Sequence, residues 1–121
     1  MKYEIDIAAG IRADRFAAIA FDKRPGRKGT VVGMQLGAHF VLRWIFQDAW
    51  KHISAGMATA DRYKLHTAKS LFNDSEAWAG HERSTCIAIG RCLAYFVSKE
   101  MLPLHCVNPH ASNKLYMLKG L

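Results

Sequence analysis

The chain has 121 residues, of which 50% are hydrophobic and 22% are charged, and its formal net charge is +7. This length suits about one domain, and this composition suits a globular protein rather than a disordered one. The apolar stretches are too short to span a membrane and no apolar signal segment follows Met1, so we expect one cytoplasmic domain that favours anionic partners.

Two short elements are expected before residue 22. Residues 2–7 alternate the apolar side chains of Tyr3, Ile5 and Ile7 with charged ones, which predicts a strand with one face in water. Residues 12–21 fit a short helix or a second strand, and we favour the helix.

The most concentrated positive charge lies in residues 22–29, where Pro25 and two glycines predict a loop. The basic side chains of this loop are those of Lys23, Arg24, Arg27 and Lys28. Lysine and arginine supply most of the sequence-independent affinity of proteins for nucleic acids, so the loop is a candidate phosphate contact. The alternative is a solvated connector with no partner.

Residues 31–53 are expected to form one long helix. Polar side chains recur at every fourth position from Gln35 to Lys51, and nearly all the other positions are apolar. Such a helix forms either the centre of the core or one side of a homodimer interface. The residues that would mark the interface are Trp44, Phe46 and Trp50, because tryptophan and phenylalanine are enriched at interface centres.

A second helix is expected to begin at Thr59 or Asp61 and to end at Phe72. Either of the first two side chains can accept a hydrogen bond from the first helical turn, and Gly56 separates this helix from the one before it.

A third amphipathic segment, residues 75–101, begins at Ser75, a good N-cap. It forms either one helix or a short turn that restarts after Gly80, with Ser84 as the cap of the restart. Pro103 follows the segment and ends it.

We expect the chain then to form a β-hairpin from residues 104–107 and 114–118. Pro109 and two asparagines in the connection supply turn chemistry. Because successive side chains of a strand point to opposite faces, Tyr116 and Leu118 are expected to share one face.

Together these elements predict an α+β fold with a three-helix core, an N-terminal strand and a C-terminal β-hairpin. Their order over residues 34–118, in which a helix runs directly into a terminal hairpin, resembles that of the winged helix-turn-helix class. In that class the helix before the wing enters the major groove of DNA. The resemblance implies a regulatory protein that binds nucleic acid, with DNA favoured over RNA.

The resemblance assigns the nucleic-acid contacts to the start and exposed face of the third segment, the hairpin tip and the basic loop. Arg83 suits a bidentate contact with guanine, and Ser84 suits a base or a phosphate. The whole set comprises Lys23, Arg24, Arg27, Lys28, His81, Arg83, Ser84, Arg91, Asn113 and Lys114. Recognition requires these side chains to face outward on the same side of the molecule.

Neither a metal site nor a catalytic site is expected. A zinc site would need His105, Cys106 and His110 together with His81 or Cys86, but neighbours on a strand point to opposite faces. No nucleophile motif, phosphate-binding glycine loop or carboxylate pair is present. We therefore expect no enzyme and no cofactor.

The alternative function is that of a small basic protein-interaction module, an inhibitor or adaptor without catalytic activity. Salt separates the two hypotheses, because nucleic-acid binding weakens steeply as salt rises. A protein partner held by the apolar helix would persist at high salt.

Overall fold

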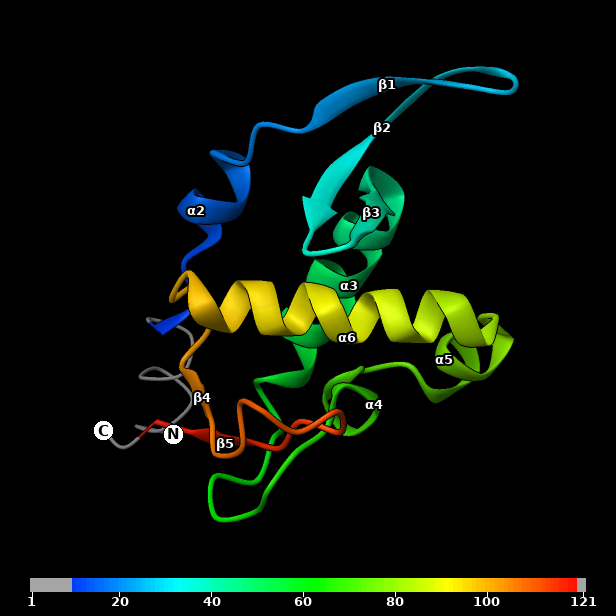
Figure 1. Cartoon of the computed structure of the whole chain (residues 1–121). Helices are drawn as coiled ribbons and strands as arrows, with labels where there is room; N and C mark the ends of the chain where they lie inside the picture. Colours follow the sequence, from blue (N-terminus) through cyan, green and yellow to red (C-terminus); the bar gives the residue numbers. More distant parts are fainter. Residues whose placement is uncertain (1–9, 120–121) are drawn as a thin grey trace.

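The computed structural model describes residues 10–119 of the protein and has a mixed α+β arrangement (Figure 1). The strand expected over residues 2–7 lies outside the described residues. Over the described part, the elements are α2 (Ala13–Ala17), β1 (Asp22–Gly26), β2 (Gly29–Leu36), β3 (His39–Leu42), α3 (Arg43–Gly56), α4 (Ala68–Leu71), α5 (Ser75–Gly80), α6 (Arg83–Ser98), β4 (Leu104–Cys106) and β5 (Tyr116–Leu118).

Helices α3 and α6 cross at the centre of the molecule, and α6 lies between the three-stranded sheet and the β4–β5 hairpin (Figure 1). Phe46 of α3 and Phe96 of α6 are fully buried, and their rings meet edge to face at 6.0 Å. Trp50 packs between Phe96 and Phe16 at ring separations of 5.2 and 5.3 Å. Such ring pairs each contribute about 0.5–1.5 kcal/mol beyond the area that they bury. Two long helices, rather than the expected three, therefore form the centre of the core.

Residues 22–26, 29–36 and 39–42 are β-strands, so the loop expected over residues 22–29 is reduced to the turn at Arg27 and Lys28, and the first half of the expected long helix is wrong. β1 pairs with β2 and β2 pairs with β3, all antiparallel, in the order β1-β2-β3. The connection between β2 and β3 is the turn at Gly37 and Ala38, and Leu36 pairs with His39 across it. Gly37 has φ of +57°, a conformation that glycine adopts at little cost and that suits the first position of a hairpin turn. The expected helix exists only from Arg43 onward.

The C-terminal hairpin is confirmed. β4 and β5 are antiparallel, and Leu104 lies opposite Leu118. Tyr116 and Leu118 are both buried while Met117 between them is partly exposed, as the alternation along the sequence predicts. This hairpin closes the core below α6.

The helix expected over residues 59–72 is wrong except for its last turn. His66 is extended and forms a bridge to Tyr116, with the His66 amide donating to the Tyr116 carbonyl at 2.7 Å and the reverse bond at 2.8 Å. A helix cannot pass through a residue whose backbone groups are paired in this way. Asp61 accepts a bond from the Tyr63 amide at 2.8 Å, which makes a local turn instead of a helix cap. Only α4 remains, and Thr67 caps it by accepting from the Ser70 amide.

The segment 75–101 forms two helices, α5 and α6, rather than one. This agrees with the expected alternative in which the helix restarts after Gly80. Asp74, not Ser75, caps α5 by accepting from the Ala77 amide at 2.9 Å. α6 restarts at Arg83 after Glu82, whose side chain makes no capping bond, so Ser84 is not the cap. The helix ends at Ser98, and Glu100 adopts a positive φ of 56° that lets the Met101 amide bond back to the Phe96 carbonyl at 2.9 Å.

Candidate functional site

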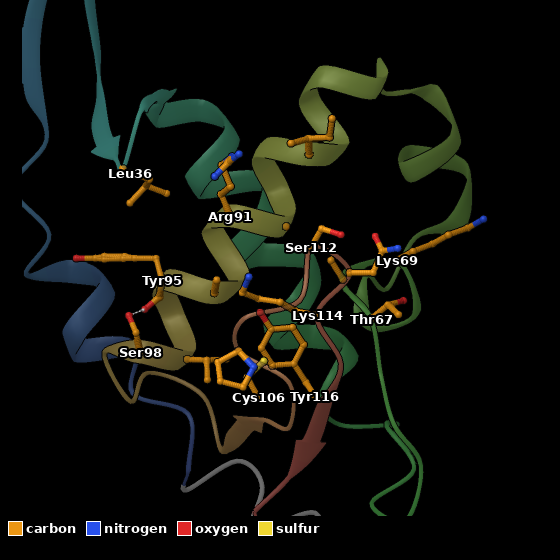
Figure 2. Close-up of a pocket in the computed structure, with 18 of the residues that line it drawn as sticks. Leu36, Thr67, Lys69, Arg91, Tyr95, Ser98, Cys106, Ser112, Lys114 and Tyr116 are labelled. Carbon is orange, nitrogen blue, oxygen red and sulfur yellow. Dashed lines mark hydrogen bonds between the residues drawn. The ribbon is translucent and has the colours of Figure 1, made fainter.

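A broad groove of about 1410 Å³ runs along the outer face of α6 (Figure 2). The helix contributes a row of residues spaced by three or four, which brings them onto one face. Among these, Gly90 and Ala94 are small, and a Cβ atom added at Gly90 would meet nothing within 4 Å. The end of β2 borders the groove on one side, while α4 and residues 109–114 border it on the other. Space beside a helix of the core is therefore open to a ligand.

The groove is basic. Its cationic side chains are those of Lys69, Arg91, Lys99 and Lys114, and none of the described residues that line it is Asp or Glu. Lys114 Nζ donates to the carbonyl of Ala111 at 3.1 Å, and Lys99 Nζ lies 5.8 Å from the centre of the Tyr95 ring. Neither contact neutralises a charge. Cations without local counter-charges produce a positive potential that attracts anions into a cleft.

The segment that borders the groove opposite β2 is braced by Asn108. Its Oδ1 accepts from the Leu115 amide at 2.7 Å, and its Nδ2 donates to the Asn113 carbonyl at 3.1 Å. These bonds close the β4–β5 connection on itself, so the side chains of Asn113 and Lys114 start from a fixed backbone. The sequence predicts a turn at this asparagine, and its side chain stabilises that turn by bonding the backbone of the connection.

Tyr116 lies at the bottom of this border, on β5. Its side chain is 2% exposed, and its hydroxyl is a buried polar atom for which the described residues provide no hydrogen-bond partner. Burial, with a smaller contribution from nearby Cys106, raises the pKa of the Tyr116 phenol to about 12. The hydroxyl therefore keeps its proton at neutral pH and remains a donor.

The structure brings together only part of the expected contact set. Arg91, Asn113 and Lys114 line the groove. Ser84 lies at the start of the same helix, where it shares a smaller hollow of about 230 Å³ with Arg91. Arg83 is exposed at the first position of α6 but does not line the groove.

The four basic residues of the segment 23–28 lie on the β1–β2 hairpin, which projects away from the helices (Figure 1). Lys23 and Arg24 are neighbours on β1 and therefore point to opposite faces of the sheet, and the guanidinium of Arg24 stacks over Phe40 at 4.1 Å. Arg27 and Lys28 form the turn of the hairpin and are exposed. None of the four lines the groove, although β2 continues from the hairpin to the groove's edge.

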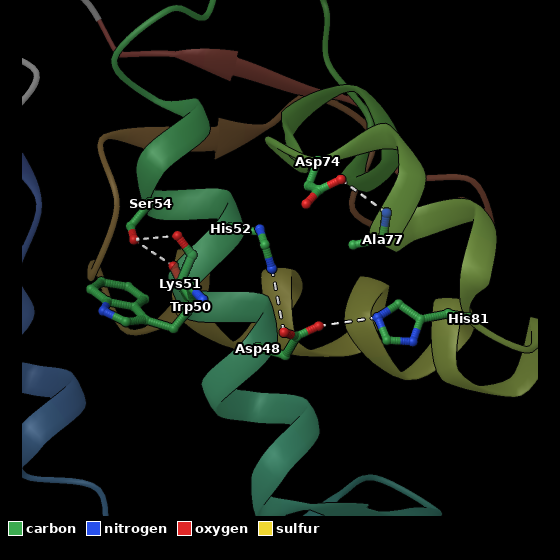
Figure 3. A network of polar contacts seen from close by, with 8 residues as sticks. All are labelled: Asp48, Trp50, Lys51, His52, Ser54, Asp74, Ala77 and His81. Atoms are coloured by element: carbon green, nitrogen blue, oxygen red, sulfur yellow. Dashed lines mark hydrogen bonds and ion pairs between the residues drawn. The ribbon is translucent and has the colours of Figure 1, made fainter.

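His81 belongs to a different, interior network (Figure 3). Its Nε2 lies 3.0 Å from one carboxylate oxygen of Asp48, and Nε2 of His52 lies 3.4 Å from the other. The side chain of His81 is only 19% exposed, and the ring of His52 stacks on Phe72 at 4.5 Å. The network ties α3 to the turn before α6, so His81 orients that helix and is not part of the groove.

Two of the three side chains expected at a homodimer interface pack against their own chain. Phe46 is completely buried within the chain and Trp50 is half-buried against Phe16 and Phe96, so neither ring is presented to a second copy. Trp44 alone of the three is exposed, at 50%, and it packs beside His81 with ring centres 6.1 Å apart.

No three His, Cys, Asp or Glu side chains among residues 10–119 are placed to hold a metal ion. His105 and His110 are exposed, and Cys86 and Cys106 are partly buried. Cys92 is fully buried, and this burial raises the pKa of its thiol to about 12, so it acts as a small core side chain.

Comparison with protein-family models, with curated proteins and with solved structures finds no match to this chain. None of the helices in the described part of the chain has the length and apolar character needed to cross a membrane.

Sequence reasoning missed Lys69, Lys99, Tyr95 and Tyr116 as lining residues. Lys69 stands on a one-turn helix and Lys99 just beyond α6, far apart in the sequence, and only the packing of α4 and α6 brings them to one groove. The aromatic residues carried no functional signal, because in a sequence an aromatic residue at helical or strand spacing predicts core packing.

Proposed function

We propose that this protein binds nucleic acid, with DNA as the expected target, along the outer face of α6. The observation that carries the proposal is the groove that contains Lys69, Arg91, Lys99 and Lys114 and no acidic side chain among its described lining residues. A polyanion that entered this groove would have four cations in its lining. Neutralised phosphates release counterions, and that release supplies much of the affinity of such complexes.

The finer part of the proposal is a winged-helix mode of binding in a transcriptional regulator. α5 and α6 are separated by only His81 and Glu82, and α6 is followed by the β4–β5 hairpin, which supports a helix-turn-helix with a wing. Arg83 at the exposed start of α6 would read a base, with Ser84 beside it on a base or a phosphate. The β1–β2 hairpin would hold neighbouring phosphates with its exposed basic turn. A cytoplasmic location and the absence of catalysis belong to this proposal.

The test is a fluorescence-anisotropy titration of labelled duplex and single-stranded oligonucleotides. We expect the double substitution Arg91→Ala with Lys114→Ala to weaken binding on the order of tenfold for every sequence, because both residues meet phosphates. Its matched control, Arg15→Ala with Lys51→Ala, removes the same charge from exposed positions outside the groove and should change affinity by less than about twofold. Equal losses in the two double variants would show that net charge, and not the groove, binds the oligonucleotide.

A second candidate function, a protein-interaction module that acts as an inhibitor or adaptor, is favoured by one observation. Ile87 lies on the groove face of α6 and is 50% exposed, so an apolar side chain is available there to a protein partner. The substitution Ile87→Ser separates the two functions. We expect it to leave nucleic-acid affinity nearly unchanged, whereas a protein partner docked on α6 would be lost.

A further inference from the structure

The unpartnered hydroxyl of Tyr116 is the feature of the groove that points most directly to a ligand. A buried donor without an acceptor has lost its hydrogen bonds to water and gained nothing in return, so such groups are rare in folded proteins. Among the described residues, Tyr116 Oη is such an atom, in a side chain that is 2% exposed. An acceptor that arrives with a ligand would satisfy it once the Lys114 side chain beside it moves aside, because the hydroxyl itself is covered in the free protein (Figure 2).

The position of this hydroxyl is fixed. The backbone of Tyr116 is paired on one side with His66, through bonds of 2.7 and 2.8 Å, and on the other side with Cys106 of β4. The ring leaves β5 toward α6, and its hydroxyl points into the crevice between α6 and residues 109–114 (Figure 2). The donor is therefore held in place before any ligand binds, which reduces the entropy lost on binding.

The crevice around the hydroxyl is suited to an anion. Lys114 extends across it toward α6, with Nζ 3.1 Å from the Ala111 carbonyl, and Ser112 lies on the same border (Figure 2). On the opposite side, the small residues Gly90 and Ala94 leave open space above the backbone of α6. A Cβ atom added at Gly90 would have no neighbouring atom within 4 Å. Hydroxyl donors, a primary ammonium group and open space together favour an oxyanion over a neutral acceptor.

We infer that this crevice is a phosphate subsite, in which Tyr116 Oη donates to a phosphate oxygen of a bound nucleic acid and Lys114 neutralises its charge. That the anion is a phosphate rests on the proposed function. A donor at the base of the crevice holds one phosphate at a fixed place, so the subsite sets the register of the strand along α6. Contacts of this kind position a nucleic acid without reading its sequence.

The test is the substitution Tyr116→Phe, which removes one oxygen atom and keeps the ring. Because the hydroxyl has no partner in the free protein, we expect the melting temperature of the free variant to equal or exceed that of the wild type. We expect its affinity for a labelled oligonucleotide to fall about tenfold, which corresponds to about 1.4 kcal/mol. The matched control is Tyr63→Phe, at a tyrosine that is 82% exposed and outside the groove, and its affinity should not change.

Three results would overturn the inference. The first is a Tyr116→Phe protein that melts at a lower temperature, because the hydroxyl would then already have an internal partner. The second is a variant that binds oligonucleotides as tightly as the wild type, which removes the subsite and leaves the proposed function standing.

The third result covers the case in which the wild type binds no oligonucleotide, so that the proposed function fails. Inorganic phosphate is then titrated while amide resonances are followed by NMR. Shifts of the Leu115 and Tyr116 amides in the wild type that are absent in Tyr116→Phe would support the subsite. Unchanged resonances in the wild type would overturn it.

Discussion

The salt dependence of binding follows directly from the groove. For duplex DNA the logarithm of the affinity falls with the logarithm of the salt concentration, with a slope of about −0.9 per neutralised phosphate. Four cations line the groove, so we expect a slope of about −3.6 if each meets one phosphate. Between about 50 and 200 mM salt the affinity then falls about 150-fold. A single strand, with a slope of about −0.7 per phosphate, loses about 50-fold over the same range.

The β1–β2 hairpin makes this measurement discriminating. If Lys23, Arg24, Arg27 and Lys28 also meet phosphates, the number of neutralised phosphates doubles and the duplex slope approaches about −7. The measured slope therefore tells whether the nucleic acid contacts the groove alone or the groove and the hairpin together.

The assay is anisotropy of a labelled duplex at four or more salt concentrations, with the slope as the readout. Arg91→Ala should make the slope shallower by about 1, because it removes one phosphate contact. The control Lys51→Ala, at an exposed position of α3 outside the groove, should leave it unchanged. A wild-type slope near zero, with duplex binding that persists at high salt, would refute the electrostatic reasoning.

Three predictions concern the fold that holds the groove. Phe46→Ala should lower the free energy of unfolding by about 3–5 kcal/mol in urea titrations, whereas Trp44→Ala should lower it by less than about 1 kcal/mol. Similar losses in the two variants would contradict a core role for Phe46. An unfolding midpoint that rises with protein concentration would support the dimer interface. Gly56→Ala places a Cβ atom 1.9 Å from the carbonyl oxygen of Leu71 and should cost about 1–3 kcal/mol by overpacking, so an unchanged midpoint would mean that α3 and α4 are further apart. Glu100→Gly relieves a positive φ and should stabilise the protein by about 0.5–1 kcal/mol in the same assay, and a destabilised variant would contradict that conformation.

Local chemistry made parts of the fold predictable. The β4–β5 hairpin was predictable because its two signals, alternating side chains and an Asn-Pro turn, both lie within the sequence of the hairpin itself. The helical spacing of Ile89, Leu93 and Phe96 likewise identified α6, because all three face the core.

The β2–β3 hairpin was missed because two periods competed. Gln35, His39 and Arg43 are four residues apart and fit one face of a helix, but in the structure Gln35 and His39 stand on different strands around Gly37. A glycine beside a single alanine between apolar runs is a weak turn signal, although it is the one that decides the structure here.

The rest of the site depends on contacts that no local pattern contains. Residues 59–67 lose their helix because His66 pairs with Tyr116, a partner far along the chain. The same pairing fixes the tyrosine that lines the groove. Arg91 and Lys114 were found as exposed cations, whereas Lys69 joins them only through the packing of α4 beside α6.

The most direct test of nucleic-acid binding along α6 is an NMR titration of the labelled protein with a short duplex. We expect the amide shifts to concentrate in residues 83–98 and 109–114, with further shifts in the β1–β2 hairpin if it meets the backbone. Shifts confined to surfaces away from α6, or no shifts at low salt, would contradict the proposed function.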